Sequence, residues 1–361
     1  MIRFVKKIII QILAIANLVT ILVMLIAGYA DRLDPTVHPS LANMGLLLPV
    51  LLIMNVGFLV AWVIFHFKNC WIPIVGFALC FPPIRNYCPL NLPEEAPPHA
   101  IKVLSYNVWY FAGWEDKGKA NPILTYLRAQ NADIVCLQEA ETTEVGKERI
   151  EAALNPIYSF HDFSLTEKGS DRMAIYSKFP ILKKEAIHYP SEGNHSTAFF
   201  LDIKGDTVIV INNHLESIGL TEEDKDSFKG MVKGELETDS IKIGSKSLYH
   251  KLANATKIRA PQAKAVAQYI EQHQDKTIIL CGDFNDGPNS FARRTIAKHL
   301  RDCYIETGNG PGISYHLGGF YVRIDQLMCS KNLKPYHCQV DNKIKTSDHY
   351  PIYCWLEKQA K

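Results

Sequence analysis

Residues 277–288 read Thr-Ile-Ile-Leu-Cys-Gly-Asp-Phe-Asn-Asp-Gly-Pro. The stretch opens with an apolar run, which is typical of a strand buried in a sheet. It then becomes a turn rich in glycine, aspartate and asparagine, which are residue types that favour tight turns. The sequence therefore predicts a buried strand whose end presents Asp283 and Asn285 toward one common point.

Five other segments repeat this arrangement, in which an apolar run meets a short polar motif. A buried sheet is a rigid platform, so side chains at several strand ends can converge although they are far apart in sequence. Carboxylates, amides and imidazoles gathered in this way suit a divalent cation together with a phosphate. The five motifs are Tyr106-Asn107-Val108, Leu137-Gln138-Glu139, Asn212-Asn213-His214, Arg323-Ile324-Asp325 and Ser347-Asp348-His349.

The oxygen-bearing residues of these motifs divide into two chemical roles. Hard cations such as Mg²⁺ take oxygen ligands, which Glu139, Asp348 and Asn107 supply. Glu139 is the strongest candidate, because a carboxylate that closes an apolar run is costly to bury without a cation or a donor. Asp283 is suited to orient or deprotonate a water that Asn285 would hold.

The two histidines placed beside these groups are His214 and His349. An imidazolium can donate to a phosphoryl oxygen that gains charge in the transition state, and Asp325 could orient one ring. Each motif also has a structural explanation, since Gly-Asp-x-Asn is a common turn and a lone histidine is more often structural than catalytic. Six such motifs in one order favour a functional site.

The first part of the 361-residue chain is strongly apolar. Residues 8–30 and 39–65 contain no charged side chain, and each run is long enough to cross about 30 Å of hydrocarbon. We predict membrane helices at about residues 8–30 and 44–67. A third run, residues 71–84, is shorter and contains three prolines, so it either spans, continuing to about residue 90, or lies re-entrant at the interface.

The third run decides which side of the membrane the rest of the chain faces. Arg3, Lys6 and Lys7 precede the first run, and this bias keeps the N-terminus in the cytoplasm. With three spans everything after about residue 90 is extracytoplasmic, and with two it is cytoplasmic. We divide the chain into a membrane region (1–90, third span 71–90), a proline-rich linker (91–100) and one domain (101–358).

Within the domain, predicted strands alternate with predicted helices, as in an α/β fold. Residues 221–251 break the alternation with seven acidic residues and six lysines, which reads as a solvated surface insertion or, because it follows His214, as a binding element. The nine cysteines include no Cys-x-x-Cys pair for zinc. The net charge of +2 gives no basic stripe of the kind that drives duplex binding.

Through the six motifs, residues 99–358 resemble the endonuclease/exonuclease/phosphatase family of metal-dependent phosphoesterases. The resemblance implies a four-layered α/β sandwich, in which two mixed β-sheets lie face to face with helices outside. Glu139 would be the principal Mg²⁺ ligand, with Mn²⁺ as a substitute, and Asn107 and Asp348 would complete the metal region. Asp283 would act on water with Asn285 as its partner.

The resemblance also implies roles for the basic residues. His349 would contact the phosphate and be oriented by Asp325. His214 matches the histidine of the Asn-x-His-Leu motif in the deoxyribonuclease and sphingomyelinase branches, as a phosphate contact or general acid. Arg172 precedes a segment similar to the family's Ala-Ile-x-Ser and is a candidate phosphate contact. Trp109 stands where exonuclease III-like members often carry an acidic residue, and this departure argues against a role in abasic-site repair.

The combination resembles bacterial members anchored in a membrane. We therefore expect a multi-pass inner-membrane protein with an extracytoplasmic catalytic domain, provided that the third run spans. Its expected activity is Mg²⁺-dependent hydrolysis of a phosphodiester or phosphomonoester on a lipid or small polar molecule, with membrane lipids and the phosphate ester as partners. The alternatives are an extracytoplasmic nuclease acting on nucleic acid and a catalytically silent binding module. Substrate identity and oligomeric state stay open.

Overall fold

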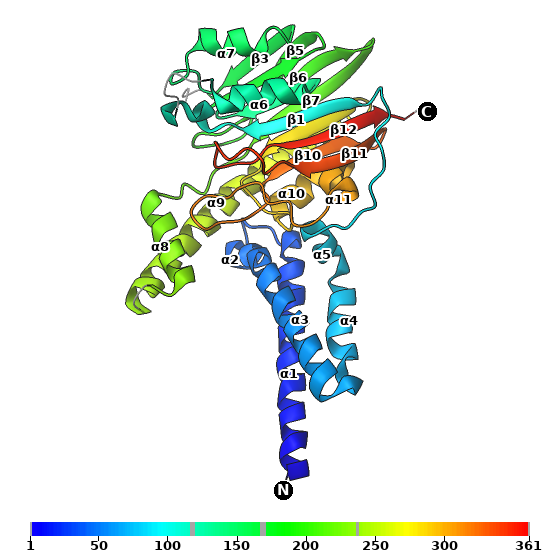
Figure 1. Ribbon diagram of the computed structural model, residues 1–361, viewed down its shortest axis with the longest axis vertical. Helices are drawn as coiled ribbons and strands as arrows, with labels where there is room; N and C mark the ends of the chain where they lie inside the picture. Colours follow the sequence, from blue (N-terminus) through cyan, green and yellow to red (C-terminus); the bar gives the residue numbers. More distant parts are fainter. Residues whose placement is uncertain (1, 116–119, 167–170, 236–237, 360–361) are drawn as a thin grey trace.

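The computed structural model describes residues 2–115, 120–166, 171–235 and 238–359. A bundle of apolar helices leads into an α/β domain that sits on one end of it (Figure 1). The N-terminus lies at the far end of the bundle, and the C-terminus lies beyond the end of the last strand of the domain.

The helical bundle contains two helical segments that are long and apolar enough to cross a membrane, Phe4–Arg32 and Pro39–Phe65. A third is present if the pair Phe67–Leu79 and Phe81–Tyr87, which is bent by 63°, counts as one span. The bundle is built from α1 (Ile2–Gly28), η1 (Ala30–Arg32), α2 (Pro39–Ala42), η2 (Asn43–Leu47), α3 (Leu48–Phe65), η3 (Phe67–Asn69), α4 (Trp71–Leu79) and α5 (Phe81–Tyr87).

The bent pair α4 and α5 returns beside α1 toward the domain (Figure 1). Gly76 lies against Ile21, and Pro83 lies against Gly28, so the pair advances in the same direction as α1. The bend follows from prolines at the first positions of α5, which cannot continue the hydrogen bonding of a preceding helix. We call α1, α3 and the bent pair the three passes of the bundle, and they place the domain at the end opposite the start of α1.

A buried polar network ties the three passes together. Asn17 Nδ2 donates to Asn55 Oδ1 at 2.9 Å, and Trp62 Nε1 donates to Asn17 Oδ1 at 3.0 Å. Asn55 Nδ2 donates to the carbonyl oxygen of Pro73 at 3.0 Å. Side-chain hydrogen bonds of this kind hold apolar helices together where lipid would offer no hydrophobic gain.

The domain contains two mixed six-stranded sheets, ordered β11-β12-β1-β2-β4-β3 and β5-β6-β7-β8-β10-β9. The pairs β1–β2 and β7–β8 are parallel, and the other pairs are antiparallel. The first sheet contains β1 (Ile101–Asn107), β2 (Ile134–Gln138), β3 (Phe160–Leu165), β4 (Arg172–Ser177), β11 (Leu333–Val340) and β12 (Ile352–Lys358). The second contains β5 (Ile181–Ile187), β6 (Ser196–Ile203), β7 (Asp206–His214), β8 (Thr277–Asp283), β9 (Leu300–Asp302) and β10 (Asp325–Ser330).

Both faces of each sheet are buried, which explains the apolar runs in the central strands. Val103 and Ile279 pack in the core between the sheets. Leu104 packs in a core that includes residues of α6 (Pro122–Gln130) and α7 (Lys147–Leu154). Leu280 packs in a core that includes residues of α9 (Thr238–Gln272) and α10 (Phe291–Ile296). The four-layered α/β sandwich expected from the sequence is confirmed.

Shorter elements complete the domain, namely η4 (Trp109–Glu115), α8 (Glu222–Lys233), η5 (Ala297–His299) and α11 (Cys303–Thr307). The charged segment 221–251, of which residues 236 and 237 lie outside the described residues, forms α8 and the start of α9. These helices project from the domain as an arm beside the bundle (Figure 1). Phe228 of α8 stacks on Phe320 with a centroid distance of 4.1 Å, so the arm contacts the loop before β10.

The domain is docked onto the bundle by buried side chains as well as by residues 91–100. Arg323, which is 2% exposed, donates to the carbonyl oxygens of Asn86 and Tyr87 at the end of α5. Asn289 Nδ2 donates to the carbonyl oxygen of Pro83 at 3.0 Å. The end of the third pass is therefore held by Asn289, which closely follows Asn285, and by Arg323, which lies two residues before Asp325.

Candidate active site

The polar motifs meet at the seam between the two sheets. In the second sheet, Asp283 at the end of β8 pairs in register with His214 of β7 and with Asp325 of β10. In the first sheet, Asn107 ends β1 and Glu139 directly follows β2, which is the parallel neighbour of β1. Local sequence sets these positions, because each residue marks the point where an apolar strand stops.

Asp283 occupies the centre of the converged groups and is 1% exposed. Its Oδ2 lies 3.3 Å from Asn107 Nδ2, 3.6 Å from His349 Nε2 and 3.8 Å from His214 Nε2. Its Oδ1 accepts the backbone N–H of Asn285 at 2.7 Å. Burial raises the pKa of Asp283, although the two imidazoles oppose this shift.

His349 is held by Asp325. The ring donates from Nδ1 to Asp325 Oδ2 at 2.8 Å, which leaves Nε2 directed toward Asp283. Burial disfavours the charged ring, but the two carboxylates outweigh it and raise the pKa of His349 well above its ordinary value. Tyr315 lies edge-on to the ring at a centroid distance of 5.1 Å. His349 is therefore a charged donor with a fixed orientation.

His214 is held in the same way by Asp171, a residue that the sequence did not indicate. The ring donates from Nδ1 to Asp171 Oδ2 at 3.0 Å. Burial disfavours the charged ring, but Asp171 outweighs it and raises the pKa of His214 to about 9. The same Asp171 oxygen lies 3.3 Å from Nδ1 of His195, which also lines a cavity of about 560 Å³. The sequence feature that could have indicated Asp171 is its position directly before the strand that begins at Arg172.

The groups expected to bind a metal lie on the other side of Asp283. Asn107 Nδ2 donates to Glu139 Oε1 at 3.0 Å, and Ser347 Oγ donates to the carbonyl oxygen of Asn107 at 2.8 Å. Ser347 thereby ties the segment that carries Asp348 to the end of β1. Burial raises the pKa of Glu139, and the negative charge of Asp348 adds to the shift. A buried carboxylate with an amide as its partner is one that a divalent cation would stabilise.

The balance of charge supports the same conclusion. Burial favours the uncharged forms of Asp283 and Glu139, and a bound cation would favour their charged forms. Asp283, Asp325 and His349 also have potential ligand atoms within 4.8 Å of one another. His349 already donates to Asp325, however, so this trio is explained as a hydrogen-bonded set. The assignment of Glu139, Asn107 and Asp348 as metal ligands stays a prediction.

Asn285 lies beside Asp283, whereas Arg172 packs on the ring of Phe163. Asn285 adopts a left-handed backbone conformation with φ 50°, and its Nδ2 donates to the carbonyl oxygen of Leu215 at 2.9 Å. This bond fixes the amide beside Asp283. The guanidinium of Arg172 lies 4.0 Å from the ring centroid of Phe163. Among the described residues, no polar contact joins Arg172 to Asp283 or to the two histidines.

A left-handed turn borders the expected metal region. Trp109, Tyr110, Phe111 and Ala112 have φ values of 42°, 54°, 55° and 46°, which are unusual for consecutive residues with side chains. Tyr110 donates its backbone N–H to the carbonyl oxygen of Glu139 at 2.9 Å. Strained backbone of this kind concentrates at functional sites. The turn therefore holds the backbone of Tyr110 against Glu139.

Comparisons with known proteins agree with this geometry. A sequence profile of the endonuclease/exonuclease/phosphatase family matches residues 104–349, and a profile described as a domain of unknown function matches residues 8–87. No curated protein matches the chain. The fold resembles an endonuclease/exonuclease/phosphatase from Beutenbergia cavernae, with 18% identity, a TM-score of 0.53 and coverage of 72% of each chain.

Two further solved structures share the fold at similarly low identity. Sphingomyelinase C from Streptomyces griseocarneus is 15% identical with a TM-score of 0.51, over 72% of this chain and 99% of that one. A beta toxin mutant from Staphylococcus aureus with bound magnesium ions is 16% identical with a TM-score of 0.50, over 71% and 99% of the two chains.

Proposed function

The chain belongs to the endonuclease/exonuclease/phosphatase family, and on this premise we propose that it hydrolyses a phosphate ester of a lipid or of a small polar molecule at a membrane surface. As a member of that family it is a metal-dependent phosphoric ester hydrolase. The proposal goes beyond family membership in its substrate class, the identity of the metal, the roles of individual residues and the anchoring of the domain in a membrane.

One observation carries the proposal: Asp283 Oδ2 lies between two imidazole Nε2 atoms, at 3.6 and 3.8 Å, and each ring is oriented by its own aspartate. Two charged donors that converge on one carboxylate form a cradle for a phosphoryl group next to a base. Neither imidazole needs to reorganise during the reaction, because Asp325 and Asp171 hold both rings. A purely structural role would not require two buried charged histidines.

The roles follow from these positions. Asp283 orients and deprotonates the attacking water, and the side-chain oxygen of Asn285 accepts a hydrogen bond from that water. His349 and His214 donate from Nε2 to phosphoryl oxygens as they gain charge, and one of them protonates the leaving oxygen. Arg172 serves as a phosphate contact for the substrate at the margin of the site.

Glu139, Asn107 and Asp348 would hold Mg²⁺, for which Mn²⁺ can substitute, and the cation would supply Lewis-acid stabilisation of the phosphoryl charge. The two carboxylates suit an ion that keeps several waters, and the Asn107 amide would turn its oxygen from the Trp109 N–H toward the cation. The magnesium ions bound to the beta toxin mutant of the same fold support this choice.

The proposed setting is a bacterial inner membrane. Arg3, Lys6 and Lys7 favour a cytoplasmic N-terminus, and three crossings then place residues 101–358 outside the cytoplasm. Residues 1–90 are the membrane region in this proposal and residues 91–100 the connection. Arg323 and Asn289 keep the catalytic loops at the end of the third pass, which favours substrates at the bilayer surface.

The test uses the full-length protein reconstituted with Mg²⁺ and a panel of substrates. The panel contains bis-para-nitrophenyl phosphate, a phosphomonoester, sphingomyelin, glycerophospholipids, inositol phosphates and plasmid DNA. We expect hydrolysis that EDTA abolishes and that is fastest on a lipid or small soluble ester. Plasmid nicking faster than every other reaction would replace the proposal with a nuclease. Binding without turnover on the whole panel would indicate a silent binding module.

A further inference from the structure

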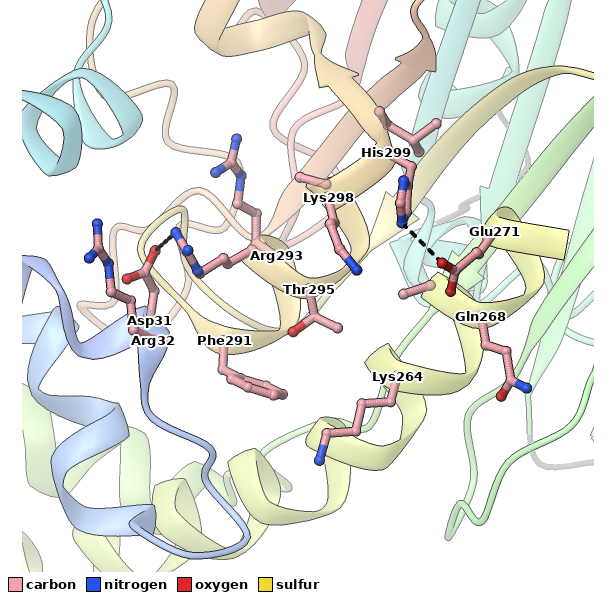
Figure 2. A pocket seen from close by; sticks show the side chains of 14 residues that line it. Asp31, Arg32, Lys264, Gln268, Glu271, Phe291, Arg293, Thr295, Lys298 and His299 are labelled. Carbon is pink, nitrogen blue, oxygen red and sulfur yellow. Dashed lines mark ion pairs between the residues drawn. The ribbon is translucent and has the colours of Figure 1, made fainter. Parts of the chain in front are cut away.

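A cavity of about 610 Å³ lies where the helical bundle meets the domain, on the outer side of α9 and α10 (Figure 2). We call it the junction pocket. Arg32 of η1 reaches it from the bundle, and Lys264 of α9, Arg294 of α10 and Lys298 of η5 reach it from the domain. In Figure 2 the side chains of Arg32, Lys264 and Lys298 lie around the pocket, with the ring of Phe291 at its edge.

The junction pocket lies at the C-terminal end of the first candidate span. Arg32 is the last residue of the candidate span Phe4–Arg32. Its guanidinium lies 4.5 Å from the ring centroid of Tyr29, whose hydroxyl donates to the carbonyl oxygen of Leu79 at 2.7 Å. Tyrosine and arginine at the end of an apolar helix mark the headgroup layer. Farther back along α1, the exposed side chains of Leu22 and Ile26 provide an apolar surface for lipid chains.

Two of the cations around the pocket are neutralised from outside its wall. Lys264 Nζ pairs with Asp34 Oδ2 at 2.6 Å. The guanidinium of Arg293 pairs with Asp302 Oδ2 at 2.7 Å. These two cations are therefore fixed parts of the wall and contribute little free charge.

The remaining cations are left for a ligand. Arg294 NH1 lies 3.7 Å from Asp31 Oδ2, a loose pair, and the buried Asp31 Oδ1 has no hydrogen-bond partner. Arg32 and Lys298 have no carboxylate within ion-pair distance among residues 2–115, 120–166, 171–235 and 238–359. An arginine and a lysine without a carboxylate partner, beside an arginine that is only loosely paired, are groups that bind phosphate oxygens.

We propose that the junction pocket binds the phosphate of an anionic phospholipid head group, with Arg32, Arg294 and Lys298 as its contacts. The lipid is bound as a ligand and is not the substrate, since these residues lie outside the converged catalytic groups. Because Arg32 belongs to the bundle whereas Arg294 and Lys298 belong to the domain, one phosphate bridges the two parts. The bound lipid therefore stabilises the docked arrangement.

The experiment measures lipid binding to the full-length protein in detergent, by native mass spectrometry and by thermal unfolding. Phosphatidylglycerol, phosphatidylcholine and inorganic phosphate are added separately to wild type, Arg32→Gln, Lys298→Gln and the double variant. Lys276→Gln is the matched control, because Lys276 is an exposed lysine beyond the end of α9 that pairs with Asp275. Turnover of a soluble phosphodiester reports whether each variant is folded.

We expect phosphatidylglycerol to bind more tightly than phosphatidylcholine and to raise the unfolding temperature of wild type. Each cation removed should weaken phosphatidylglycerol binding about fivefold, as expected for one basic residue at an anionic surface. Lys276→Gln should bind phosphatidylglycerol as wild type does. Turnover of the soluble substrate should be unchanged in every variant. Equal phosphatidylglycerol binding by wild type and the double variant would overturn the proposal. Stabilisation by inorganic phosphate as strong as that by phosphatidylglycerol would also overturn it, because the ligand would then be a soluble anion.

Discussion

Two histidine–aspartate pairs lie at the seam between the sheets. Their geometry is similar, but the sheet that supplies the histidine differs between them. His349 precedes a strand of the first sheet and is held by Asp325 of the second, at 2.8 Å. His214 ends a strand of the second sheet and is held by Asp171, which precedes a strand of the first, at 3.0 Å. Both rings direct Nε2 toward the same oxygen of Asp283. Each sheet thus contributes one histidine and one orienting aspartate.

The pairs differ in what supports the aspartate. Asp325 lies directly opposite Asp283 in strand register and follows Arg323, which is bonded to the end of α5. Asp171 has no such backbone constraint from Asp283 and is shared with a second histidine, His195, at 3.3 Å. The first pair therefore depends on docking to the bundle, whereas the second depends on how the two sheets pack. Variants of Asp283, of the two histidines and of their aspartates test this difference.

The largest effect is expected at the carboxylate that the pairs share. Asp283→Asn removes the base and should lower turnover of a soluble phosphodiester about 10³-fold, within the range for loss of an acid–base group. The Mg²⁺ concentration for half-maximal rate should stay near that of wild type. Glu139→Gln is the contrasting variant, because it should raise that concentration. Wild-type turnover in Asp283→Asn would remove Asp283 from the mechanism.

The second prediction asks whether the two rings are equivalent. Because their Nε2 atoms lie 3.6 and 3.8 Å from the same oxygen, His349→Gln and His214→Gln should each lower turnover by about 10². His161→Gln, on β3, is the matched control and should leave the rate unchanged. If one catalytic variant loses turnover and the other retains it, the ring that can be replaced is structural and the comparison fails.

The third prediction separates the orienting aspartates. Asp325→Asn should lower turnover more than Asp171→Asn, about 10² against about tenfold, because Asp325 also constrains Asp283. Asp171 helps to raise the pKa of His214 to about 9, so Asp171→Asn should move this pKa down toward 6.5. The alkaline limb of activity should then shift to lower pH. A pH–rate profile of each variant measures this shift, with Asp162→Asn on β3 as the control.

The same pKa shift affects stability. The pKa of His214 is raised on folding, so its pair with Asp171 contributes stability that is fully present below about pH 6.5 and is lost as pH rises through about 9. The difference in free energy of unfolding between wild type and Asp171→Asn should shrink across that interval. A difference that grows with pH would contradict the charged state assigned to His214.

The smallest effect on rate is expected at the docking contact. Arg323→Met keeps an unbranched stem but leaves the carbonyl oxygens of Asn86, Tyr87 and Pro311 without their donor. Each unsatisfied buried acceptor costs about 1–3 kcal/mol, so Tm should fall by several degrees. Turnover should fall only a few-fold, through displacement of Asp325.

The matched control for this prediction is Arg301→Met, which removes a partly exposed arginine paired with Glu306. It should lower Tm less than Arg323→Met does. If the two variants have equal Tm, the docking contact does not support the domain. A domain prepared without residues 1–90 should show the same weakness as Arg323→Met, because it also lacks the end of α5.

The sequence by itself determined the fold class and most of the converged residues. Apolar runs mark strands that are buried on both faces, and the residue at which a run stops is local information. Asn107, Glu139, Asp283 and the two histidines could therefore be predicted as one group at strand ends. Two apolar helices could be predicted for the same reason, because length and the absence of charge are properties of the segment alone.

Only the tertiary structure decided the pairing of side chains across the seam. Arg172 matched a motif but lies over Phe163, whereas its neighbour Asp171 holds His214. Nothing local distinguishes the two residues, because their partners depend on how one sheet packs on the other. The direction of the bent third pass and the contacts of Arg323 are decided in the same way. Strand ends follow from short-range burial, but contacts between sheets, and between the domain and the bundle, follow from packing over the whole chain.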